Sequence, residues 1–484
     1  MERGALCLFG ICFFAGSAVA CGAVLGFEDR SLDPGLVNGD EAKGDALINP
    51  AEGSAADAPS GALVAPTNVV ATNVEPVGDV KTLAGSGMPD FKEGQGIAAA
   101  FKNPYGVIVE PGGNIYVADP GNARIRKVTP NGMVTTLAGS GVEGWLDGTA
   151  SQAKFGTPGD LTVDASGNLF VPEYGNHRIR KVTPGGVVTT LAGSGAVGGV
   201  DGAGTVATFS QPIAAAIDSN GNVYVAELSG NRIRMVTPTG DVSTLAGSGA
   251  AAFADGTGVA ASFNNPAGVA VTPNGDAVYV ADNGNSRIRK ITPGGVVTTV
   301  AGSGTPSFAD GKGLLASLNN PTGLAFFAST GDLFFSDSGN SRVRRMAPDG
   351  TVTTLAGQFL KGYTDGKGPI AQFDSLQGMA VDSVGNLYVA DYANHRIRKI
   401  TVTGIGDLEV SWSPPATTGR SPTVKSYTAT ATADAHPTKT CTASILNKCT
   451  IGGLVSGIPY SVTVTVATAV ETSPASVASV AAPN

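Results

Sequence analysis

Histidine, cysteine and tryptophan are scarce in this chain, which leaves few imidazole or thiol groups for metal binding or nucleophilic catalysis. Its 484 residues include three histidines (His177, His395 and His436), five cysteines and two tryptophans. Charged residues make up 14% of the chain, and the net charge is −8 with a pI near 5.0. This balance argues against a nucleic-acid partner. Beyond the N-terminus no apolar run is long enough to span a bilayer, so we expect no membrane-spanning helix.

Residues 1–20 have the form of a secretory signal peptide. Arg3 precedes an apolar run over residues 5–15, and small residues follow at 16–20. Ala18-Val19-Ala20-Cys21 resembles a bacterial lipobox, with Ala18 where Leu is usual, but Ala18-x-Ala20 also fits an ordinary signal-peptidase site. We favour lipidation of Cys21 over simple secretion. Either outcome places the protein in the bacterial cell envelope or outside the cell.

Two cysteines, Cys441 and Cys449, lie far from this segment. In an exported chain such a pair predicts one disulfide. Residues 21–62 are rich in Ala, Gly, Asp and Pro and show little apolar periodicity. That composition predicts a disordered, acidic and Ala-rich stalk.

The chain does contain a repeat of 54 or 55 residues that occurs six times. In one unit, β-rich runs at 161–163, 169–171, 178–182 and 187–192 are separated by Gly, Pro, Asn and Asp. Four short strands in a unit of this length are typical of a propeller blade. The same arginine marks each unit: Arg124, Arg178, Arg232, Arg287, Arg342 and Arg396.

The repeated phrases Gly-Asn-Leu-Tyr-Val-Ala-Asp and Asn-x-Arg-Ile-Arg-Lys resemble those of NHL repeats. This resemblance implies an all-β fold with a six-bladed β-propeller over residues 76–401. The last unit stops after its third strand, whereas residues 78–84 match a fourth strand. We therefore expect the N-terminal strand to complete the last blade, which would leave no open sheet edge.

Residues 402–484 resemble a fibronectin type III β-sandwich. Trp412 lies in an alternating strand, and the stretch from Leu454 to Tyr460 resembles a tyrosine corner. Exported bacterial members of that family often carry a cysteine pair where this chain has its own. The Pro-rich first strand of such a domain is missing after the propeller but is matched at 63–75. Either the propeller is inserted after the first strand of the sandwich, which we favour, or 63–75 is a linker.

The sixfold recurrence decides which charged residues are candidates for a site. Asp119, Asn122 and Arg124 have equivalents in the other units, so we assign them to turns and strand pairing. His177 and His395 occupy the same position in units 2 and 6, which are not neighbours, so we expect no shared metal ion.

Some propellers that resemble this one are enzymes, namely amidating lyases and sugar lactonases. The resemblance implies acidic, Asn or His ligands that converge on a central channel. The corresponding innermost positions of this chain are Gly106, Asp160, Ala214, Gly268, Gly323 and Gly378. One carboxylate does not make a hydrolytic metal site. We therefore expect no metal, no cofactor and no catalytic residue.

Asp160 is the one innermost position that is charged, with Tyr105 and Tyr174 near it in the repeat pattern. It is either a functional group at the channel mouth or a carboxylate satisfied by local hydrogen bonds. A second candidate is an aromatic side chain two residues before the recurrent acid of each long connection. These side chains are either packed inside the connections or exposed as a ring suited to sugars or peptides: Phe91, Trp145, Phe253, Phe308 and Tyr363.

The sequence thus favours an exported, surface-anchored binding protein that presents its propeller to a protein or glycan. The alternative is a metal-dependent enzyme that resembles the lactonases or amidating lyases, and a third hypothesis is a scaffold that only positions the sandwich. We expect a monomer whose membrane contact is limited to a lipid on Cys21.

Overall fold

The computed structural model describes residues 65–74, 76–404, 407–414, 424–433, 436–444, 447–454, 460–468, 472–473 and 475–479. The predicted signal peptide, Cys21 and the stalk at 21–62 lie outside the described residues. Within them, no helix is both long and apolar enough to cross a bilayer.

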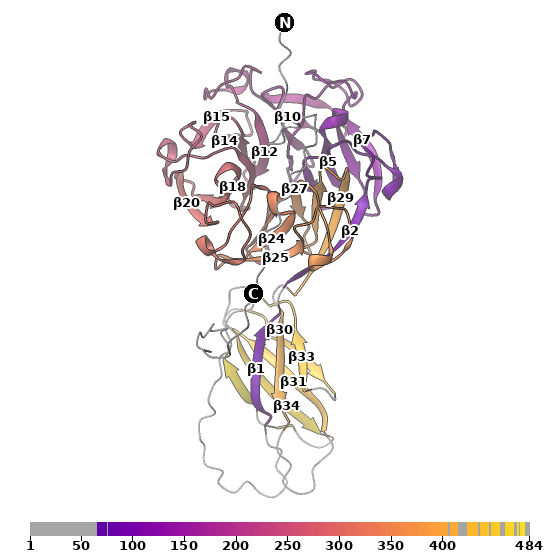
Figure 1. Ribbon diagram of the computed structural model, residues 1–484, viewed down its shortest axis with the longest axis vertical. Helices are drawn as coiled ribbons and strands as arrows, with labels where there is room; N and C mark the ends of the chain where they lie inside the picture. Colours follow the sequence, from indigo (N-terminus) through magenta and orange to yellow (C-terminus); the bar gives the residue numbers. More distant parts are fainter. Residues whose placement is uncertain are drawn as a thin grey trace, which may run out of the picture. The chain divides into compact units, whose positions relative to one another are not determined.

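Six antiparallel sheets of four or five strands account for the described residues from 77 to 403 (Figure 1). We number them in the order of the repeats. Sheets 1 to 3 are β3(Gly94–Gln95)-β7(Met133–Ala138)-β6(Arg124–Val128)-β5(Ile115–Asp119)-β4(Val107–Val109), β11(Val188–Ala192)-β10(Arg178–Val182)-β9(Leu169–Glu173)-β8(Thr162–Val163), and β12(Pro212–Ile217)-β13(Val223–Glu227)-β14(Arg232–Val236)-β15(Val242–Ala246). Sheets 4 to 6 are β16(Gly256–Thr257)-β20(Val296–Ala301)-β19(Arg287–Ile291)-β18(Val278–Asp282)-β17(Pro266–Val271), β21(Gly311–Lys312)-β25(Thr351–Gly357)-β24(Arg342–Met346)-β23(Asp332–Asp337)-β22(Pro321–Phe327), and β26(Gly366–Lys367)-β2(Val77–Ala84)-β29(Arg396–Thr403)-β28(Leu387–Asp391)-β27(Leu376–Val381).

Short 3-10 helices interrupt the connections and the turns that precede the third strands. Their bounds are η1 Gly96–Ala98, η2 Pro120–Asn122, η3 Gly204–Val206, η4 Gly258–Ala260, η5 Asn283–Asn285, η6 Gly313–Leu315, η7 Ser338–Asn340 and η8 Gly368–Ile370. The turn between the third and fourth strands needs glycine, as Gly186 illustrates with a φ of +81°. Glycine adopts this left-handed backbone without steric cost.

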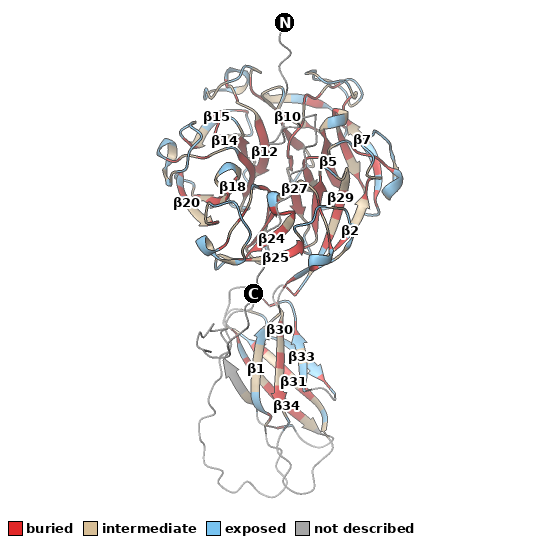
Figure 2. Ribbon diagram, in the orientation of Figure 1, coloured by how far each residue is buried: buried red, intermediate tan, exposed pale blue. Residues whose placement is uncertain are grey.

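The first strands of the six sheets contact one another in a closed circle, β4, β8, β12, β17, β22, β27 and back to β4. Small residues permit this close approach: a Cβ on Gly106 would lie 2.5 Å from the Cα of Asp160. Alternate residues of the strands pack between neighbouring sheets, where Figure 2 shows the buried positions. One recurrent apolar residue of each long connection is fully buried there: Phe101, Phe155, Phe209, Phe263, Leu318 and Phe373.

The predicted completion of the last repeat by the N-terminal strand is confirmed. β2 pairs with β29 in antiparallel register, with Asp79 opposite Thr401. Asp365, in the connection before sheet 6, accepts hydrogen bonds from the backbone N and the Oγ1 of Thr82 at 3.0 and 3.1 Å. The first and last parts of the repeat region therefore belong to one sheet.

The remaining strands form two further sheets. They are β1(Thr67–Asn73)-β30(Leu408–Ser413)-β33(Lys448–Ile451) and β32(Lys439–Ala443)-β31(Val424–Thr432)-β34(Ser461–Thr468)-β35(Ser476–Ser479). Trp412, Tyr427 and Tyr460 lie in one apolar cluster, against which Val69 of β1 packs. A disulfide joins Cys441 to Cys449. A strand that precedes the six repeats in the sequence is thus hydrogen-bonded to a strand that follows them.

Candidate functional site

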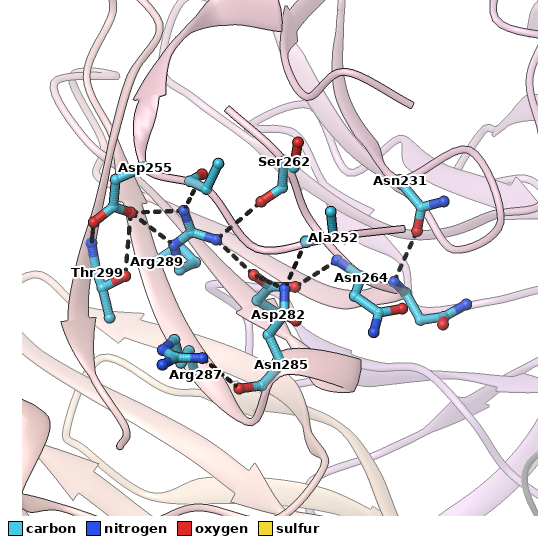
Figure 3. Close-up of polar contacts among 12 residues, drawn as sticks. Asn231, Ala252, Asp255, Ser262, Asn264, Asp282, Asn285, Arg287, Arg289 and Thr299 are labelled. Carbon is cyan, nitrogen blue, oxygen red and sulfur yellow. Dashed lines mark hydrogen bonds and ion pairs between the residues drawn. The ribbon is translucent and has the colours of Figure 1, made fainter. Parts of the chain in front are cut away.

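The most extensive polar network of the repeats surrounds a second arginine, two residues after the marker arginine. In sheet 4 the fully buried Arg289 donates to Oδ2 of Asp282 and to Oδ1 of Asp255, both at 2.6 Å (Figure 3). Asp255 also accepts from the Oγ1 of Thr299 at 3.1 Å, which ties the long connection to the outer strand. The buried arginines at this position are Arg126, Arg180, Arg234, Arg289, Arg344 and Arg398.

The carboxylate of this network is itself buried. Burial raises the pKa of Asp282, while the hydrogen bonds from Asn264, Asn285 and Arg289 act in the opposite direction. Asn285 donates to Asp282 Oδ2 at 2.9 Å, as the Asp-x-x-Asn spacing leads one to expect (Figure 3). The recurrent charged residues are therefore engaged in stabilising each sheet, which is the role we assigned to them from their recurrence.

The two histidines shared by repeats 2 and 6 have a similar structural contact. Nδ1 of His177 accepts the backbone N–H of Gln211, and Nδ1 of His395 accepts that of Asn103, both at 3.1 Å. Each contact links one repeat to the next. Burial, followed by the charge of the adjacent arginine, lowers the pKa of both imidazoles.

Asp160 lies just before β8, where it approaches the first strands of the neighbouring sheets. It is 6% exposed, and its Oδ1 accepts the backbone N–H groups of Val107 at 3.2 Å and Leu161 at 3.1 Å. A Cβ on Gly378 would lie 2.6 Å from the same oxygen, so the carboxyl group reaches across β4 towards β27. Burial raises the pKa of Asp160 to about 8.

Tyr105 and Tyr174 lie with Asp160, as the repeat pattern suggested. Burial raises the pKa of Tyr105, and the nearby Asp160, Tyr392 and Tyr174 contribute in that order. The rings of Tyr105 and Tyr392 meet edge to face, with their centroids 6.4 Å apart. Tyr392 was missed from the sequence, although it holds the same position in repeat 6 as Tyr174 does in repeat 2.

A cavity of about 160 Å³ lies beside Asp160, towards the turns between the first and second strands of the sheets. It is lined by residues from the first strands of all six sheets. Apart from Asp160 and Thr162, the lining side chains are apolar, among them Ile108, Leu161, Val269, Phe326 and Met379. Within the described residues, no group of three or more His, Cys, Asp or Glu side chains is placed to hold a metal ion.

The five aromatic residues of the long connections share a different environment. Each is partly exposed, and each ring lies under the guanidinium of its own marker arginine: Phe91 under Arg124 at 3.9 Å, Trp145 under Arg178 at 4.1 Å, Phe253 under Arg287 at 3.9 Å, Phe308 under Arg342 at 3.9 Å and Tyr363 under Arg396 at 4.3 Å. These aromatic side chains are therefore neither buried inside the connections nor fully exposed to solvent. Instead one side of each ring is covered and the remainder faces solvent.

Comparisons with known proteins agree with the fold. The NHL repeat family matches residues 263–291 and 373–400. The chain is 30% identical over 295 residues to the chloroplastic protein SUPPRESSOR OF QUENCHING 1 of Arabidopsis thaliana, covering 57% of this chain and 28% of that protein. It is 28% identical over 333 residues to the chicken NHL repeat-containing protein 2, covering 59% of this chain and 44% of the relative. The match therefore spans less than half of either relative.

Two solved structures from Bacteroides share the fold. One is a protein of unknown function from Bacteroides thetaiotaomicron, with a TM-score of 0.53, 20% identity, and coverage of 68% of this chain and 76% of the other. The second is an auxiliary nutrient binding protein from Bacteroides ovatus, with a TM-score of 0.51, 21% identity, and coverage of 68% and 77%. The chain contains NHL repeats, and its all-β fold is built of propeller-like sheets of four to five strands.

Proposed function

We propose that this protein is an exported binding module in which a closed six-bladed propeller presents its long connections to a protein or glycan partner. The observation that carries the proposal is the set of five aromatic residues stacked under their marker arginines. The arginines are themselves held in place, since Arg287 donates to the backbone oxygens of Asn285 and Ser303 at 3.2 and 3.0 Å. Aromatic side chains fixed before binding lose little conformational entropy when a partner arrives.

The surroundings of these aromatic residues support an interface. Aromatic and arginine side chains are enriched where proteins contact partners. The same connections expose further large apolar side chains, among them Ile97, Val142, Val206, Val259, Leu315 and Ile370. We infer that these apolar side chains belong to the surface that a partner covers.

The C-terminal strands and the disulfide support the proposal that the protein is exported. We infer that β1, β30 to β35 form a fibronectin type III-like sandwich into which the propeller is inserted, because β1 pairs with β30. The Cys441–Cys449 disulfide supports an exported protein, since disulfides persist in oxidising compartments. Attachment through a lipid on Cys21 remains part of the proposal, as does a monomeric state. The Bacteroides nutrient-binding relative shares only the fold at 21% identity, so it does not identify the ligand.

The test is an affinity pull-down and a glycan array with the chain from residue 63 onward. A double variant, Phe253→Ala with Phe308→Ala, should weaken the strongest partner at least tenfold. The matched control is Val384→Ala, because Val384 is 78% exposed but lies in a turn outside the long connections. Partner binding that is equal in the two variants would contradict the proposal.

The enzyme alternative is favoured by one observation, the buried carboxyl of Asp160 beside a cavity. Metal analysis of the purified protein separates the two functions. A stoichiometric metal that is lost in Asp160→Ala would support the metal-dependent enzyme over the binding module.

A further inference from the structure

The cavity beside Asp160 has an unusual distribution of polar groups. Most of its lining side chains are apolar and come from six strands, and Asp160 is the one charged residue among them. Burying a carboxyl group in such surroundings costs free energy unless its oxygens find partners. One oxygen, Oδ1, has two, the backbone N–H groups of Val107 and Leu161. Among the described residues, Oδ2 has no hydrogen-bond partner.

The two carboxyl oxygens of Asp160 differ in their hydrogen bonds, and this difference indicates which oxygen carries the proton. Oδ1 accepts two N–H donors, so a proton carried by the carboxyl group is placed on Oδ2. A carboxylic acid held neutral in this way can donate a hydrogen bond to a ligand. The raised pKa of Asp160, about 8, agrees with a neutral acid at pH 7.

The neighbouring strands supply no charge that would change this protonation state. The residues next to Asp160 on the neighbouring strands are Gly106 and Val107 of the first repeat, Ile213 on β12 and Gly378 on β27, and none of them is charged. Glu173, on the strand paired with β8, is an ion-pair partner of Arg180 at 2.8 Å. Tyr105 is the titratable neighbour, and its own pKa is raised, so it too is neutral at pH 7.

We propose that this cavity binds a small, uncharged and largely hydrocarbon molecule, and that Asp160 donates a hydrogen bond to a single carbonyl or hydroxyl oxygen of that ligand. The volume of about 160 Å³ suits a substituted six-membered ring, since an apolar protein cavity of about 150 Å³ holds benzene. The apolar side chains of the wall contact the hydrocarbon part of the ligand, and the acid fixes its orientation. This site is separate from the stacked aromatic residues, so it stands or fails independently of the proposed function.

The experiment uses the full chain and three probes of nearly equal shape in calorimetry or ligand-observed NMR. Acetophenone offers an acceptor oxygen, α-methylstyrene replaces that oxygen by a methylene group, and 1-phenylethylamine offers a cation. We expect acetophenone to bind about tenfold more tightly than α-methylstyrene, which is the effect of one net hydrogen bond. Its affinity should fall as the pH rises through 8, because the ionised acid cannot donate.

Two variants make the test specific. Asp160→Asn keeps one acceptor oxygen and replaces the acid O–H by an NH2 donor, so it should retain acetophenone and lose the pH dependence. Ala216→Leu fills the cavity away from the acid and should abolish binding of all three probes. Tightest binding of the amine, with affinity that rises with pH, would overturn the proposal. So would equal affinities for acetophenone and α-methylstyrene, or no binding of any probe at millimolar concentration.

Discussion

Nδ1 of His395 accepts the backbone N–H of Asn103 at 3.1 Å, and this contact joins the last repeat to the first. Asn231 does the same in repeat 3, where its Oδ1 accepts the N–H of Asn265 at 2.9 Å. The chain therefore offers its own conservative replacement for the histidine, and this replacement does not titrate.

The first prediction concerns pH. Burial and the charge of Arg396 lower the pKa of His395, so the folded state favours the neutral ring. An unfolded histidine titrates near pH 6.5. Stability from this group is fully present above that pH and is lost as the pH falls through the folded pKa. Urea unfolding between pH 5 and 8 should show this loss, and His395→Asn should reduce it.

His395→Ala serves as the comparison at neutral pH. It removes the acceptor, and we expect a cost of about 1 kcal/mol, whereas His395→Asn should cost less. Equal stabilities for the three proteins at pH 7.5 would show that the contact between the last and first repeats contributes nothing.

The second prediction concerns the buried arginines. Arg289→Met leaves the carboxylate of Asp282 buried without its cation, and we expect a loss of about 3–5 kcal/mol. The control is Arg287→Met in the same strand. Arg287 is partly exposed and lies over Phe253, so its loss should cost about 1 kcal/mol. Denaturant unfolding of both variants measures the difference, and similar costs would contradict the assignment of Arg289 to the core.

The third prediction concerns the two strands at the N-terminal end. A chain that begins at residue 76 lacks β1 but keeps β2, so it should destabilise the sheets of β30 to β35 and spare the repeats. A chain that begins at residue 85 also exposes the edge of β29, and unpaired edges promote association. Calorimetry and size-exclusion chromatography of the two truncations test this. Identical melting and elution would refute the pairing of β2 with β29.

The fourth prediction uses the two tryptophans. Trp145 is 49% exposed and Trp412 is 5% exposed, so acrylamide should quench only the emission of Trp145. Trp145→Phe copies the residue type of repeats 1, 4 and 5 and should keep the stacking on Arg178. Its remaining emission should resist the quencher, with stability within about 0.5 kcal/mol of the parent protein. Strong quenching in this variant would show that Trp412 is exposed.

Much of the fold could be predicted because the repeat supplies six independent copies of each signal. The strands, the buried phenylalanines and the pairing of residues 78–84 with the last repeat all follow from that periodicity. The pair Arg124 and Arg126 shows the limit. Side chains two residues apart in a strand point to the same side, so alternation does not say which of the two is buried, and the marker arginine proved to be the more exposed one.

The candidate sites were only partly predictable. Asp160 stood out because its counterparts are small, and Tyr105 and Tyr174 followed from their position. The cavity itself could not be predicted, because its wall combines short stretches of six strands spread over some 270 residues of sequence. Nor did the sequence show that the aromatic rings would be covered on one side by arginine, since that depends on the path of each connection.

Because β2 and β29 are far apart in the sequence, they cannot pair until most of the chain has been synthesised. β2 leaves the ribosome long before its partner β29, which begins only at Arg396. At ordinary rates of translation the intervening chain takes roughly 15 to 60 seconds to produce. For that interval β2 lacks β29, and β1 likewise lacks β30, so chaperone binding or premature association should be most evident at the beginning of this protein and not at its end.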